Sequence, residues 1–119
     1  MRPVPHALAP SQWGTYQCIV PSPISDAARQ LGERIKLRRI ELACSQEEIA
    51  HLAGMNVSNY GKIERGLGNP NFHTLVLIAS VLSIDPAELV KGIGGESLPK
   101  RKVVYSAADY IRERAAHRG

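Results

Sequence analysis

The sequence predicts an all-α domain of five short helices, preceded by an extended arm and followed by a basic tail. Apolar residues recur at intervals of three and four positions across residues 26–90, which is the spacing of amphipathic helices. Ser, Asn and Asp precede these apolar groups, and Gly follows several of them, as expected for helix caps. The flanks differ in composition: five prolines lie in the first 23 residues, and a segment containing Gly and Pro occupies residues 91–100.

Length and composition limit the class of protein. A chain of 119 residues has room for one domain with tails. No apolar run approaches the roughly 18 residues of a membrane span, and the N-terminus lacks the pattern of a secretion signal. Cys18 and Cys44 form no motif. We therefore expect a soluble, cytoplasmic protein that does not contact membranes.

The charge is distributed unevenly along the chain. Residues 26–90 carry seven Lys and Arg against eight Asp and Glu, whereas residues 91–119 carry seven against three. The basic excess therefore lies in the tail, and charge alone does not make the central region a DNA binder. We divide the chain into an extended or disordered arm (1–25), a helical domain (26–90) and a linker with a basic tail (91–119).

The first two helices are predicted from their caps and apolar spacing. The first should run from an N-cap at Asp26 to Leu42, with an inward face of Ala28, Leu31, Ile35 and Leu42. The second opens with SQEE, in which Ser45 is the cap and Glu48 closes a capping box. Gly54 ends this helix. Its inward residues are Ile49, Ala50 and Ala53.

Three further helices complete the domain. The third is capped by Asn56 and stopped by Gly66, with an inward face of Val57, Tyr60 and Ile63. The fourth begins near Asn71 and is expected to bury Leu75, Ile78, Ala79 and Leu82. The fifth is short: Asp85 caps it, Pro86 is its first residue, and Glu88 forms a second capping box before Leu89 and Val90.

The connection between the second and third helices has the spacing of a helix-turn-helix, because only about three residues, including Gly54, join them. The third helix would then project short polar side chains able to bond base edges and phosphates. Val57 could offer a methyl contact to thymine. Gln46 should lie beside the N-terminus of the third helix. The projecting residues are Asn56, Ser58, Asn59, Lys62 and Arg65.

Gly61 conflicts with a purely structural explanation of the third helix. A glycine in a helix interior costs about 0.5 to 1 kcal/mol relative to alanine. Stability does not explain its presence. The question is whether its bare backbone lies against a DNA groove or against the second helix.

The string SQEEIAHLAGMNVSNYGKIERGLGNPN, followed by LVLIASVLSIDPAEL, resembles the phage Cro and repressor type helix-turn-helix family, also called Xre-like. The resemblance covers about residues 30–90, and SQEEIA, AG, KIERG and NP are its specific marks. It implies a compact, five-helix, lambda-repressor-like domain. Such domains bind double-stranded operator DNA, usually as homodimers, with the third helix in the major groove.

The resemblance also implies roles for individual residues. It implies a phosphate contact from Gln46, further phosphate contacts from Arg65 and from the backbone around Gly68 and Asn69, and an ion pair between Arg39 and Glu64. The base-reading positions are Asn56, Val57, Ser58, Asn59 and Lys62. The chain departs from the family at position 61, which is often serine, and at Tyr60, where a smaller aliphatic residue is usual.

Apolar residues beyond those needed for one inward face suggest a dimer seam, formed by Val76, Leu77, Val81 and Leu89. The tail contains the basic cluster PKRK (99–102), a short extended piece at 103–105 and a candidate helix over 106–117. This helix is either simply solvated or makes phosphate or dimer contacts. The arm or the tail could also bind a protein partner.

The leading hypothesis is a sequence-specific transcriptional regulator, a small repressor or autoregulator that binds a palindrome as a homodimer. Its half-sites would lie about 34 Å apart. A restriction-modification controller or the antitoxin of a toxin-antitoxin pair is an alternative within this class. A protein-interaction module bridging parts of the transcription apparatus is the alternative from another class. The four histidines are scattered and no catalytic set converges, so we expect no metal, cofactor or enzymatic activity.

Overall fold

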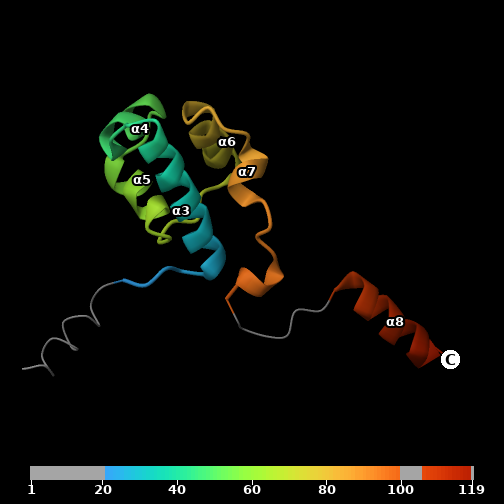
Figure 1. The fold of residues 1–119 in the computed structure, drawn as a ribbon. Coiled ribbons are helices and arrows are strands. Elements are labelled where there is room, and N and C mark those ends of the chain that lie inside the picture. The colour runs from blue at the N-terminus through green and yellow to red at the C-terminus, as the bar shows by residue number, and fades with distance from the viewer. Residues whose placement is uncertain (1–20, 100–105, 119) are drawn as a thin grey trace, which may run out of the picture.

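The computed structural model describes residues 21–99 and 106–118, and every regular element within them is helical (Figure 1). The predicted all-α class is therefore confirmed. The helices of the domain are α3 (Asp26–Glu41), α4 (Gln46–Leu52), α5 (Val57–Glu64), α6 (Phe72–Val81) and α7 (Pro86–Val90). A 3-10 turn, η1 (Gly95–Ser97), and a further helix, α8 (Ala107–Arg118), follow them.

Some predictions lie outside the described residues. They are the arm over 1–20, the basic cluster over 100–102 and the extended piece over 103–105. The candidate helix of the tail is present as α8, and none of its side chains is buried. Across the described ranges, no helix combines the length and apolar character that crossing a bilayer requires.

The core is formed where α3 to α7 meet. Most residues predicted to face inward are buried, and each large apolar side chain removed from water contributes about 1.5 to 3 kcal/mol. Leu42 is an exception, since it is 37% exposed and caps the C-terminus of α3. The largest fully buried side chains are Ile35, Ile49, Tyr60, Ile78, Leu82 and Leu89.

The N-terminus of α3 differs from its prediction by one residue. Ser25 is the N-cap, because its extended backbone lets Oγ accept a hydrogen bond from Ala28 N at 3.0 Å. Asp26 is instead the first helical residue. Its carboxylate accepts hydrogen bonds from Arg29 Nε at 2.8 Å and Gln30 Nε2 at 2.9 Å. The hydrogen bond from Arg29 is the main cause, and that from Gln30 the next, of a pKa of Asp26 below its usual value.

The other caps follow the sequence signals, with one difference. Ser45 and Glu48 form the predicted two-way capping box, and Asn71 Oδ1 accepts from Thr74 N at 2.8 Å. At α7 the predicted second capping box with Glu88 does not form. The side chain of Asp85 caps the helix alone, because its Oδ1 accepts a hydrogen bond from Ala87 N. This helix has only five residues, and Pro86 occupies its first position.

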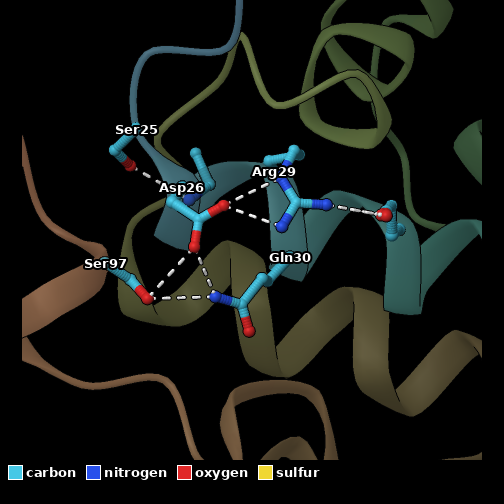
Figure 2. A network of polar contacts seen from close by, with 7 residues as sticks. Ser25, Asp26, Arg29, Gln30 and Ser97 are labelled. Carbon is cyan, nitrogen blue, oxygen red and sulfur yellow. Dashed lines mark hydrogen bonds and ion pairs between the residues drawn. The ribbon is translucent and has the colours of Figure 1, made fainter.

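The segment expected to be a linker is packed on the domain. Ser97 is buried, and its Oγ accepts a hydrogen bond from Gln30 Nε2 at 3.0 Å and donates one to Asp26 Oδ2 at 3.4 Å (Figure 2). The packed structure therefore does not end at Val90. It continues to η1, which is hydrogen-bonded through Ser97 to the first turn of α3.

Gly32 controls how closely α3 and α5 approach each other. A Cβ atom at Gly32 would lie 2.4 Å from the carbonyl oxygens of Ile63 and Glu64, far inside van der Waals contact. Only a residue without a side chain fits this crossing. This role could not be predicted from the sequence, because the contact joins residues that lie far apart in the chain.

We expect Gly32→Ala to destabilise the domain by about 1 to 3 kcal/mol, since α3 and α5 must move apart to admit the methyl group. Urea unfolding followed by circular dichroism measures the change. Lys36→Ala, at an exposed position of the same helix, is the control and should change stability by less than about 0.5 kcal/mol. Equal stabilities of the two variants would contradict the close crossing.

Candidate nucleic-acid interface

The link between α4 and α5 sets the direction of α5. Gly54 has a φ of +64°, a left-handed conformation that suits glycine, and Met55 N donates to Ala50 O at 2.8 Å. Asn56 then caps α5, because its Oδ1 accepts from Ser58 N at 2.8 Å and from Asn59 N at 3.3 Å. The chain thus turns and begins the next helix within a few residues.

The outer face of α5 is polar and exposed. Tyr60, Gly61, Ile63 and Glu64 form the buried side of this helix. Val57 is 42% exposed, so the expectation that it faces inward is wrong: the buried stripe begins one turn later, at Tyr60. The exposed residues at the start and along the outer side are Asn56, Val57, Ser58, Asn59, Lys62 and Arg65.

Behind this face, Arg39 of α3 binds Glu64 of α5 through two hydrogen bonds. Arg39 Nε lies 2.7 Å from Glu64 Oε2, and Arg39 Nη2 lies 3.0 Å from Glu64 Oε1. Only 12% of the Arg39 side chain and 1% of the Glu64 side chain are exposed. Such a two-point charged contact fixes both separation and orientation, so it ties the end of α5 to α3.

The ion pair keeps Glu64 charged although it is buried. Burial opposes ionisation, but Arg39 first, and then the neighbouring Tyr60 hydroxyl and Gln46, outweigh it, so the pKa of Glu64 lies below its usual value. Tyr60 lies beside this pair with its hydroxyl buried and without a hydrogen bond of ordinary geometry. Burial, together with the neighbouring Glu64 carboxylate, raises the pKa of the Tyr60 hydroxyl, so it stays protonated.

Gln46 does not lie where the sequence predicted. Its Nε2 donates to Glu64 Oε1 at 2.8 Å, and its Oε1 lies near Gly61. Gln46 therefore packs against the later part of α5 and not beside its N-terminus. The error arose because residue spacing gives the order of helices but not the crossing point of α4 and α5.

A shallow groove of about 280 Å³ separates α5 from the start of α6. Asn59 and Lys62 line it from α5, and the exposed Asn69 lines it from the following loop. Gly68 allows this loop to lie close to α5, because a Cβ there would be 2.8 Å from Ile63 Cγ1. Asn71 and Thr74 also line the groove, and neither was predicted to bind DNA.

The four residues predicted to form a dimer seam do not share one surface. Leu89 is fully buried in the core, so its assignment to a seam is wrong: α7 turns it inward against the domain. Leu77 is 42% exposed, while Val76 and Val81 are half-buried. In the part of the chain that the structure describes, no group of His, Cys, Asp or Glu could hold a metal ion.

Comparisons with known proteins agree with this geometry. The helix-turn-helix family model matches residues 35–89. The SPbeta prophage-derived uncharacterized HTH-type transcriptional regulator YonR of Bacillus subtilis (strain 168) is 34% identical over 61 residues, which are 51% of this chain and 56% of that protein. The chain thus spans about half the length of this relative.

Solved structures give the same result. The restriction-modification controller protein C.AhdI from Aeromonas hydrophila is 34% identical, with a TM-score of 0.51 over 52% of this chain and 94% of its own. The P22 c2 repressor, solved with a synthetic operator, is 31% identical with a TM-score of 0.50 over 52% and 94%. The biofilm regulator SinR, solved with DNA, is 35% identical with a TM-score of 0.50 over 51% and 98%.

The fold and the projecting helix define a helix-turn-helix domain with the architecture of these repressors and controllers. The chain belongs to the phage Cro and repressor type helix-turn-helix family, as its sequence motifs suggested.

We expect Glu64→Ala to lower the free energy of unfolding by about 3 to 5 kcal/mol, because it leaves the largely buried Arg39 without its partner. Thermal and urea unfolding measure the loss. Glu33→Ala removes a half-exposed carboxylate that pairs with Arg29, and it should cost about 1 kcal/mol or less. An unchanged melting temperature in Glu64→Ala would refute the importance of the pair.

The pair also predicts how stability depends on pH. Because the pKa of Glu64 is lower in the folded protein than its ordinary value of 4.5, its contribution is present above that value and is lost as pH falls through the folded pKa. The stability difference between the protein and Glu64→Gln should therefore shrink below about pH 4.5. Urea titrations from about pH 3 to pH 7 measure it. A difference that stays constant over this range would show that ionisation of Glu64 is not what matters.

Proposed function

We propose that the protein is a sequence-specific DNA-binding transcriptional regulator that inserts α5 into the major groove. The observation that carries this proposal is the contrast between the two sides of α5. Its inner side is fixed by the Arg39–Glu64 ion pair, whereas its outer side exposes amide, hydroxyl and ammonium groups. A rigid helix with such a surface suits hydrogen bonding to base edges.

The exposed residues divide into two functional groups. Ser58, Asn59 and Lys62 can bond to base edges in the groove, and the exposed methyl groups of Val57 can contact thymine. Arg65 and Asn69, after the reading positions, bind phosphates and fix the register of the helix on the duplex. Gln46 has one N–H committed to Glu64 and offers the other to a phosphate.

The regulator acts as a homodimer on a palindrome, with half-sites about 34 Å apart so that two copies of α5 enter successive major grooves. Leu77, with Val76 and Val81, supplies the apolar contact between the subunits. Bound over a promoter in the cytoplasm, the dimer represses by occlusion. The P22 c2 repressor, whose structure includes operator DNA, supports this mode of action.

Selection of bound sequences from random duplex DNA tests the proposal. We expect a palindromic motif with half-sites about one helical turn apart. Lys62→Ala and Ser58→Ala should each relax the preference at one position of each half-site, with a loss of about 1 to 3 kcal/mol at that base pair. A preference relaxed at one position would identify the base pair that the substituted side chain contacts.

The control is Lys36→Ala, which removes the same charge from an exposed position on α3 and should leave the selected motif unchanged. Enrichment of no motif by the unmodified protein would overturn sequence-specific binding. A motif without internal symmetry would overturn the dimer.

A further inference from the structure

Gly61 lies in a different environment from the helix-crossing Gly32. A Cβ at Gly61 would lie 3.0 Å from Arg65 Nη1, 3.4 Å from Gln46 Oε1 and 3.9 Å from Arg65 Cζ. These three nearest atoms all belong to side chains, whereas the atoms nearest to Gly32 belong to the backbone of α5. The missing side chain at Gly61 therefore makes room for two polar groups and not for a neighbouring helix.

Glu64 decides which end of the Gln46 amide faces Gly61. The Glu64 carboxylate can only accept hydrogen bonds, so it must be met by the amide nitrogen, and Gln46 Nε2 donates to it at 2.8 Å. The carbonyl oxygen of Gln46 is thereby turned towards Gly61 and the side of α5 on which the Arg65 guanidinium lies. A carbonyl dipole pointing this way attracts a cation.

We propose that Gly61 is a positioning residue for Arg65: it forms a seat in which the guanidinium lies back across α5 beside the Gln46 carbonyl. The inference rests on the proposed function, because it gives this arrangement a role in binding DNA phosphate. A long arginine side chain normally loses conformational freedom when it binds. Because the seat already restrains Arg65, its side chain loses less conformational freedom on binding. The exposed edge of the guanidinium keeps N–H groups for a phosphate.

An alanine at this position would disturb the seat without breaking the helix. Its Cβ would be closer to Arg65 Nη1 than ordinary contact distance, so the mobile guanidinium has to shift. The backbone of Gly61 lies within helix α5, where alanine is the better helix former. Gly61→Ala should therefore fold with an equal or higher melting temperature, and this separates a binding effect from a folding effect.

The seat can be tested without DNA. Nitrogen-15 relaxation of the Arg65 Nε–H group should report a more restricted side chain in the unmodified protein than in Gly61→Ala. Arg118, exposed at the end of α8, is the internal reference and should not change. Equal mobility of Arg65 in the two proteins would overturn the seat, whatever the protein binds.

A double-mutant cycle then tests its role in binding. Affinities for a generic duplex at low salt and for the selected operator are compared in the protein, Gly61→Ala, Arg65→Ala and the double variant. We expect Gly61→Ala to weaken binding about threefold to tenfold and Arg65→Ala about tenfold or more, with a salt slope lower by about 1 in the latter. The double variant should bind no more weakly than Arg65→Ala alone.

Two results would overturn the inference. Gly61→Ala could leave both affinities unchanged, or it could weaken binding equally with and without Arg65, which would mean that DNA approaches the bare backbone of Gly61 directly. If the unmodified protein binds neither duplex, the proposed function fails, and the relaxation measurement still decides whether the seat exists.

Discussion

The Glu64 carboxylate is the point on which three helices depend. Its oxygens accept hydrogen bonds from Arg39 of α3 and Gln46 of α4, while Glu64 itself ends α5. A charge so far removed from water is tolerable only when its partners are in place, so few arrangements of these helices satisfy it. Gly32 complements the pair by letting α3 approach the backbone of Glu64. Charge geometry and close backbone contact together fix where α5 lies.

This constraint matters because α5 has only eight residues. Isolated helices shorter than about 12 residues are marginal in water, so the structure of α5 comes from its caps and from what lies behind it. Asn56 holds its first turn, Tyr60 and Ile63 anchor its middle in the core, and Glu64 holds its end. All of these groups lie at the termini or on the inner side. The outer residues are consequently free to vary with the ligand and need not contribute to the fold.

The sequence predicted the helix caps that depend on residues close together in the chain. Ser45 with Glu48, and Asn56 before α5, are signals read within four residues, and the structure has both caps. The start of α3 was predicted one residue too late, because both Ser and Asp favour the cap position and the extended backbone at Ser25, not the residue type, makes Ser25 the cap.

Contacts between residues far apart in the chain could not be predicted from the sequence. The burial of Leu89, the crossing at Gly32 and the place of Gln46 on α5 all depend on how helices meet, and so does the docking of Ser97 on Gln30. That residues 95–97 of the expected linker dock on α3 could not be foreseen for the same reason, because Gly and Pro indicate a turn but not whether that turn packs. The Arg39–Glu64 pair could be anticipated only through the family resemblance, since 25 positions separate its members.

The two flanks of the chain come together on the domain. Ile24, Leu98 and Pro99 line one cleft, and the backbone N–H of Ile24 donates a hydrogen bond to Gly66 O. Both flanks of the chain therefore meet the packed domain at the same small area of its surface.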